Sequence, residues 1–152
     1  MMPDYAKLLS AATQAVADAC LVCRTVQDDM DRVRAIIKDD NSPVTVADFA
    51  SQAVVGHTLR EVMGGCIMVG EETSSYLRNP EHGAQLAATL AAAQEVWGDA
   101  DEPSLLEAID LGAADPDHAG FWTLDPIDGT KGFLRGHQYA VCLAYIERGE
   151  PV

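Results

Sequence analysis

Residues 122–130 of the chain read Trp122-Thr123-Leu124-Asp125-Pro126-Ile127-Asp128-Gly129-Thr130, which places two carboxylates and a hydroxyl close together. The apolar run from Phe121 to Leu124 is typical of a buried strand. Pro126 has a fixed φ and biases the residue before it toward extended backbone. We therefore expect Asp125 to end the strand and to project its carboxylate outward.

The residues after the two carboxylates are suited to an anion. Gly129 can take backbone angles that are closed to other residues, and it lets a phosphate approach the main chain closely. Thr130 stands where a following helix can begin, with its hydroxyl and the first free N–H groups facing the anion. This arrangement favours a phosphate bound through a metal ion.

A further acidic pair follows a second predicted strand. Cys66 to Val69 is a short apolar run between glycines, which suits a buried strand with Glu71 and Glu72 at its carboxyl end. Glu71, Asp125 and Asp128 offer the hard oxygen ligands that Mg²⁺ prefers. Without a cation, such like charges would repel one another strongly. The alternative is that the two aspartates only cap a turn or a helix, and the short motif alone leaves both interpretations open.

Two long helices are predicted before these strands. An apolar stripe in steps of three and four indicates an amphipathic helix over residues 9–30, followed by a loop at residues 38–43. Thr45 and Asp48 have the spacing of a capping box, and the helix that they open should end at Gly64. The first stripe comprises Leu9, Ala12, Val16, Ala19, Cys23, Val26 and Met30, and the second comprises Phe49, Ala53, Val55, Leu59 and Val62.

Shorter elements complete the predicted pattern. Residues 81–97 and 104–109 are expected to be helical, with a loop at residues 112–120. Residues 138–147 form a mostly apolar strand, and the turn composition after it begins a hairpin that has no second arm.

The charge of the chain excludes some partners. Its 24 acidic and 10 basic side chains give a formal charge of −14, without a cluster of basic residues that would neutralise phosphates. Binding to nucleic acid is therefore not expected. An acidic protein can still bind a small phosphate ester when divalent cations lie between its carboxylates and the phosphate.

Neither a targeting segment nor a membrane span is expected. The start of the chain lacks a basic region followed by an apolar stretch, so we expect a cytoplasmic protein. The longest apolar run, Tyr139 to Ile146, is far shorter than the roughly 20 residues that cross a bilayer. Cys20 and Cys23 form a C-x-x-C without a second such pair, and we interpret them as small buried helix residues rather than a zinc or redox site.

Three motifs, in order along the chain, resemble a known family. Residues 122–136 are similar to the signature of the lithium-sensitive, magnesium-dependent phosphatases that include inositol monophosphatase. Residues 131–141 resemble the 3′(2′),5′-bisphosphate nucleotidase branch of that family. The segments at residues 42–48 and 69–72 also match it, so the resemblance extends over most of the chain.

The resemblance implies a metal site. Glu71, Asp125 and the backbone carbonyl of Ile127 would hold one Mg²⁺, and Asp125 and Asp128 would bridge to a second one roughly 4 Å away. Members of the family use two or three such ions. Two cations would then flank the phosphate to be cleaved.

The resemblance also implies catalytic roles. Asp48 and Thr130 match positions that orient the attacking water and help to deprotonate it, with Glu71 assisting through a loosely held metal. Gly129 and Thr130 would contact the substrate phosphate. The capping box alone would explain Asp48, and the family match favours its place in the site.

The expected reaction is removal of the 3′-phosphate from adenosine 3′,5′-bisphosphate, which gives AMP and inorganic phosphate. One alternative is an inositol-phosphate or sugar-phosphate phosphatase. An alternative of another class is a non-catalytic acidic module in which the motif is a relic. The partner is a small nucleotide, and the sequence predicts no oligomeric state.

The expected fold is α+β, a layered α/β sandwich of the inositol monophosphatase-like (sugar phosphatase) type with a largely antiparallel sheet. Residues 1–152 would be its amino-terminal catalytic-metal domain. The family implies a second α/β half with a further aspartate ligand and most of the nucleotide pocket, which these residues do not contain. We therefore expect little activity from these residues alone.

Overall fold

The computed structural model describes residues 3–29, 36–37, 43–116 and 119–152. Its elements in chain order are α1 (Tyr5–Asp28), β1 (Ile36–Ile37), β2 (Pro43–Val44), α2 (Val46–Met63), β3 (Met68–Val69), the 3₁₀ helix η2 (Pro80–His82), α3 (Gly83–Gln94), α4 (Glu102–Asp110), β4 (Gly120–Asp128), α5 (Thr130–Leu134), β5 (Ala140–Glu147) and β6 (Glu150–Pro151). Most of the predicted loop at residues 38–43 lies outside the described residues.

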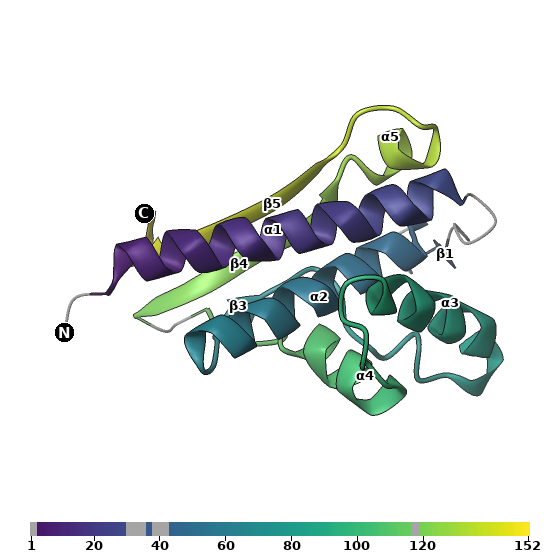
Figure 1. Cartoon of the computed structure of the whole chain (residues 1–152), viewed down its shortest axis with the longest axis horizontal. Coiled ribbons are helices and arrows are strands. Elements are labelled where there is room, and N and C mark those ends of the chain that lie inside the picture. Colours follow the sequence, from purple (N-terminus) through teal and green to yellow (C-terminus); the bar gives the residue numbers. More distant parts are fainter. Residues whose placement is uncertain (1–2, 30–35, 38–42, 117–118) are drawn as a thin grey trace.

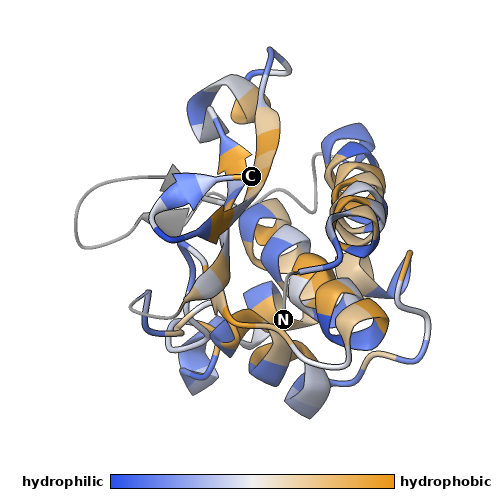
Figure 2. Ribbon diagram, turned by 90° about the vertical axis from the view of Figure 1, so that its left-hand side faces the viewer, coloured by the Kyte–Doolittle hydropathy of each residue, from blue (hydrophilic) through white to orange (hydrophobic). Residues whose placement is uncertain are grey.

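The main sheet has the strand order β3-β4-β5-β6. β3 pairs with β4 in parallel, and β4 with β5 and β5 with β6 pair antiparallel. α1 and α2 pack against the sheet, and α3 and α4 lie beyond α2 (Figure 1). The view turned by 90° shows apolar residues on the strands and on the neighbouring helices (Figure 2). The predicted α+β layers are confirmed, with one parallel pair in an otherwise antiparallel sheet.

The centre of the molecule is α2, which contacts α1, α3, α4 and β4. It begins at the predicted capping box, where the Thr45 hydroxyl accepts from the backbone N–H of Asp48 and the Asp48 carboxylate accepts from that of Thr45. It ends as predicted, at Gly64 in the left-handed conformation. Of its 18 residues, 13 are buried. The buried surface of α2 is therefore wider than the single apolar side that was predicted. One predicted member of that side, Val62 near the end of the helix, is exposed.

Small side chains bring α1 close to its neighbours. Ala11, Ala15 and Ala19 are fully buried, each one turn after the last. The predicted stripe is correct from Ala19 onward but is displaced by one residue before it, because Leu8 is buried and Leu9 is 69% exposed. Met30 lies outside the described residues.

The length and composition of α1 alone would permit a membrane crossing. In this structure its alanine-rich face instead packs into the core of the domain, together with Val22, Cys23 and Val26. The predicted helices at residues 81–97 and 104–109 are present with shifted bounds. The first is α3, which follows the short helix η2, and the second is α4, which begins at Glu102.

The strand β5 has two different sides. Val141, Leu143 and Tyr145 pack against the buried clusters. The alternate residues Cys142, Ala144 and Ile146 face the other way, because side chains alternate along a strand. The predicted hairpin after β5 does have the start of a second arm, since β6 pairs with it at Ile146–Pro151 and Glu147–Glu150.

All four cysteines are free thiols. Cys23 is fully buried in the core, as predicted, and burial raises the pKa of its thiol to about 12. Cys20 is only half-buried.

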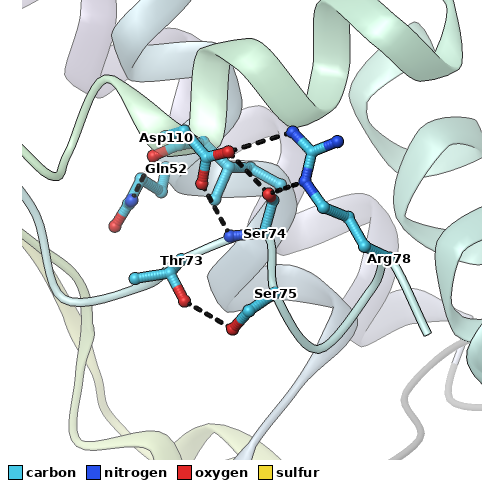
Figure 3. A network of polar contacts seen from close by, with 7 residues as sticks. Gln52, Thr73, Ser74, Ser75, Arg78 and Asp110 are labelled. Atoms are coloured by element: carbon cyan, nitrogen blue, oxygen red, sulfur yellow. Dashed lines mark hydrogen bonds and ion pairs between the residues drawn. The ribbon is translucent and has the colours of Figure 1, made fainter.

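A polar network fixes the turn that follows Glu72 (Figure 3). The Asp110 carboxylate at the end of α4 accepts from the backbone N–H of Ser74 at 2.8 Å and from its hydroxyl at 2.6 Å. Arg78 donates to the Ser74 hydroxyl at 2.6 Å and to Asp110 at 3.1 Å. The turn is therefore tied to α4 by an ion pair and by backbone contacts.

Enlarging the alanine stripe should destabilise the fold. Ala15→Leu adds three carbons at a fully buried position, and overpacking of this kind costs about 1–3 kcal/mol of unfolding free energy. Ala17→Leu makes the same change on the exposed side of α1 and should stay within about 0.5 kcal/mol of wild type. Urea unfolding followed by circular dichroism measures both. Equal effects of the two variants would contradict the packing described for α1.

The Asp110 network should make stability depend on pH. Burial raises the pKa of the Asp110 carboxyl, but the Ser74 hydrogen bonds and the Arg78 charge outweigh burial, so the pKa is lowered overall. A lowered folded-state pKa stabilises the protein above the unfolded pKa, and that contribution is lost as pH falls through the lowered value.

Asp110→Asn should therefore reduce the urea midpoint at neutral pH, and its difference from wild type should shrink as the pH falls below about 4. Asp99→Asn, at an exposed loop position, is the control and should show no such trend. A difference for Asp110→Asn that stays constant with pH would show that the carboxylate charge has no part in the effect.

Candidate active site

The parallel strands β3 and β4 bring two predicted ligands to one edge of the sheet. Val69 pairs with Thr123, and two residues beyond these partners lie Glu71 and Asp125. Neighbouring strands run about 4.8 Å apart, so the two chains leave this pairing at neighbouring points, although the pairing itself ends at Val69 and Thr123 and Glu71 lies beyond β3. Glu71 is exposed and Asp125 is half-buried.

A bulge in β4 sets the direction of the two aspartates. Asp125 pairs with Cys142 and Asp128 with Ala140, so three steps along β4 match two along β5. In a regular strand, positions three apart point to opposite faces of the sheet, and the extra residue of the bulge cancels this. Because Cys142 and Ala140 share a face, their partners Asp125 and Asp128 share it too. Contrary to prediction, the strand runs through Asp125 and ends at Asp128.

The bulge places its two middle residues inward. Pro126 and Ile127 are both buried, and Ile127 joins the core cluster. The backbone N–H of Ile127 donates to the Asp125 carboxylate at 3.2 Å, and the Pro126 carbonyl accepts from the Ser51 hydroxyl of α2 at 3.1 Å. The bulge is therefore tied to the central helix.

The helix α5 begins at Thr130, as predicted. Gly129 before it has φ +90°, the left-handed region in which a Cβ is strained. The Thr130 hydroxyl lies 3.1 Å from the Ile127 carbonyl and 3.4 Å from the Asp48 carboxylate. One hydroxyl proton serves two acceptors, so the hydroxyl donates to one of them at a time.

Asp48 is both a helix cap and a neighbour of Thr130. One carboxylate oxygen accepts from the backbone N–H of Thr45 at 2.8 Å and from its hydroxyl at 2.6 Å. The other oxygen faces the Thr130 hydroxyl. Asp48 is only 2% exposed, so its position is fixed by these contacts. The two interpretations of Asp48 are therefore compatible.

The predicted metal donors are hard oxygens, which fits Mg²⁺. They are the carboxylates of Glu71, Asp125 and Asp128 and the carbonyl of Ile127. Within the part of the chain that the structure describes, no group of three or more His, Cys, Asp or Glu side chains is arranged so that it could hold a metal ion. The donor chemistry suits the cation, and the full ligand set stays a prediction.

Sequence reasoning missed two side chains of α2. Ser51 and Gln52 are fully buried and contact the segments that carry Pro126 and Glu71. They follow Asp48 by three and four positions, so the three polar residues share one side of the helix. Polar residues at this spacing within an apolar, buried helix were the available signal.

The chain matches the inositol monophosphatase family over residues 4–152. It is 41% identical to 3′(2′),5′-bisphosphate nucleotidase 1 of Candida albicans, an alignment that covers 97% of this chain and 44% of that protein. It is 43% identical to 3′(2′),5′-bisphosphate nucleotidase of Schizosaccharomyces pombe over 78% of this chain and 36% of that protein. It is 40% identical to 3′(2′),5′-bisphosphate nucleotidase 1 of Arabidopsis thaliana, over 97% of this chain and 45% of that protein.

The chain thus spans less than half the length of these curated relatives. The matched residues nevertheless include those at the ends of β3 and β4, the two aspartates of the bulge, Asp48 and Thr130. This chain belongs to the inositol monophosphatase family.

Proposed function

We propose that the protein containing this chain is a metal-dependent phosphomonoesterase that converts adenosine 3′,5′-bisphosphate into AMP and inorganic phosphate. The observation that carries the proposal is the half-buried contact between Asp48 and Thr130 beside the strand end with Asp125 and Asp128. Curated relatives named 3′(2′),5′-bisphosphate nucleotidase, 39–43% identical to the chain, support the substrate class.

In this reaction the bond between phosphorus and the ribose 3′ oxygen breaks, and a bond forms between phosphorus and a water oxygen. The water supplies, in net terms, one proton to the ribose oxygen. Thr130 holds the attacking water while its own hydroxyl proton is directed to Asp48. In that orientation the threonine oxygen accepts a proton of the water, and the Asp48 charge favours its removal.

Glu71, Asp125 and the Ile127 carbonyl would hold one Mg²⁺, and Asp125 and Asp128 would hold a second. When bound, the cations supply the positive charge that allows this acidic chain to hold a phosphate and that stabilises charge in the transition state. Gly129 leaves the main chain open beside that phosphate, because it has no side chain.

We place the protein in the cytoplasm, with a small nucleotide as its partner and neither nucleic acid nor membrane. The four free thiols fit a reducing compartment. The net charge of −14 disfavours a long polyanion. A phosphatase acting on inositol phosphate or sugar phosphate is the second candidate, because the family that the chain matches is that of inositol monophosphatase.

The substrate class can be measured on the complete gene product, which is the protein chain as the cell makes it. We expect phosphate release from adenosine 3′,5′-bisphosphate with Mg²⁺, at a kcat/KM well above that for inositol monophosphate. Chelation with EDTA should abolish release, and added Mg²⁺ should restore it. A preference for inositol monophosphate would favour the second candidate, and metal-independent or absent turnover would contradict the proposal.

Removing the Asp48 charge should impair chemistry more than folding. Asp48→Asn keeps an oxygen that can accept the helix-cap hydrogen bond, but it weakens proton removal, so kcat should fall by about 10²–10⁴. Asp18→Asn is a matched control, because the Asp18 carboxylate of α1 also accepts from a threonine hydroxyl, that of Thr58 at 3.0 Å. Thr58 lies in the second half of α2, whereas Asp48 lies at its start. Steady-state kinetics and thermal unfolding distinguish the two. Equal loss of kcat in both variants would remove Asp48 from the reaction.

A further inference from the structure

Gln52 binds the backbone of the segment that carries Glu71. Its carbonyl oxygen accepts from the backbone N–H groups of Glu71 at 3.1 Å and Glu72 at 2.9 Å. Its amide nitrogen donates to the carbonyls of Glu72 at 2.7 Å and Ile109 at 2.8 Å. The side chain is fully buried, and all four of its hydrogen-bonding positions are used. Gln52 therefore replaces a length of sheet pairing that β3, at two residues, does not supply.

Two glycines make room for this amide. A Cβ at Gly70 would stand 2.5 Å from the Gln52 carbonyl oxygen, and one at Gly112 would stand 2.5 Å from its amide nitrogen. The two glycines also bond directly, since the N–H of Gly70 donates to the carbonyl of Gly112 at 2.8 Å. Any larger residue at either position would displace the amide.

The same segment is held again just beyond Glu72. Asp110 fixes Ser74 through its backbone N–H and its hydroxyl, and Gln52 and Asp110 reach the chain from neighbouring points on α2 and α4 (Figure 3). Glu71 lies at the start of this fixed stretch. Its main chain is therefore anchored, although its side chain is exposed.

The helix α2 relates this stretch to the rest of the site. Asp48 contacts Thr130, Ser51 contacts the Pro126 carbonyl, and Gln52 contacts Glu71. These three side chains occupy one side of a helix, where positions three and four apart are neighbours. One rigid element thus sets the positions of the three segments that carry the proposed site residues.

We propose that Gln52 is a positioning residue: it holds the backbone of Glu71 opposite Asp125, so that the Glu71 carboxylate is placed for the cation. This inference rests on the proposed function. Groups behind a ligand commonly orient it, and their loss reduces metal affinity by roughly 10- to 100-fold. An amide suits the task because it donates and accepts at once, whereas methionine has a similar shape and offers neither strong donor nor strong acceptor.

The test is binding of Mn²⁺ to the complete gene product, measured by electron paramagnetic resonance of the free ion. Gln52→Met should weaken binding by roughly 10- to 100-fold and raise the Mg²⁺ concentration for half-maximal velocity by a similar factor. At saturating Mg²⁺, kcat should recover most of its wild-type value. In the metal-free protein, the amides of residues 71 and 72 should exchange hydrogen faster than in wild type.

Gln94→Met is the matched control. Gln94 also joins a helix to a backbone carbonyl, that of Ala100 at 2.8 Å, but it lies on α3 away from the site. This variant should bind Mn²⁺ as wild type does. Gln52→Asn, which is shorter but keeps the amide, provides a milder variant if Gln52→Met does not fold, and it should show the same changes with smaller size.

A double-mutant cycle with Glu71→Gln separates positioning from general loosening of the fold. If Gln52 acts through Glu71, adding Gln52→Met to Glu71→Gln should weaken Mn²⁺ binding no further. Additive losses would overturn the inference, as would wild-type affinity in a folded Gln52 variant. If wild type binds no Mn²⁺, or if Glu71→Gln binds it as tightly as wild type, the proposed metal site itself is wrong and the inference falls with it.

Discussion

In a helix that is buried around most of its circumference, a polar side chain is costly unless it finds a hydrogen-bond partner. α2 is such a helix, with 13 of its 18 residues buried. Three of its polar residues have partners elsewhere in the chain. Asp48 contacts the start of α5, Ser51 contacts the bulge of β4, and Gln52 contacts the segment after β3. The demand for hydrogen bonds therefore joins the core to the site, and the same contacts that satisfy α2 bring together segments more than 50 residues apart in sequence.

The parts of the fold that follow local rules could be predicted from the sequence. The capping box at Thr45, the end of α2 at Gly64 and the helix start at Thr130 each depend on a few adjacent residues. The stripe of α1 was partly wrong for a physical reason. Alanine is small and only weakly apolar, so a helix rich in alanine offers two faces of nearly equal hydrophobicity, and tertiary packing chose the face with Ala11 and Ala15 over the one with Leu9.

The site could be predicted as a set of residues but only in part as an arrangement. The motif and its resemblance identified Asp48, Asp125 and Thr130, and the contact of Asp48 with Thr130 is present. The length of β4 was underestimated because proline normally disrupts a strand interior, whereas a bulge tolerates it. Gln52 was missed because a polar residue in a helix is usually solvated, and only the tertiary structure reveals that it is enclosed.

The bulge in β4 makes the number of residues between Asp125 and Asp128 as important as their identity. Pro126 and Ile127 act as a spacer between the two aspartates. If both residues were paired regularly without the bulge, Asp128 would turn to the core side of the sheet, whereas removing one of them would keep the two aspartates on one face but leave a single residue in place of the buried pair. The extra residue therefore lets the segment do two things at once: the aspartates stay on one face, while Ile127 fills the core and the Pro126 carbonyl binds the central helix.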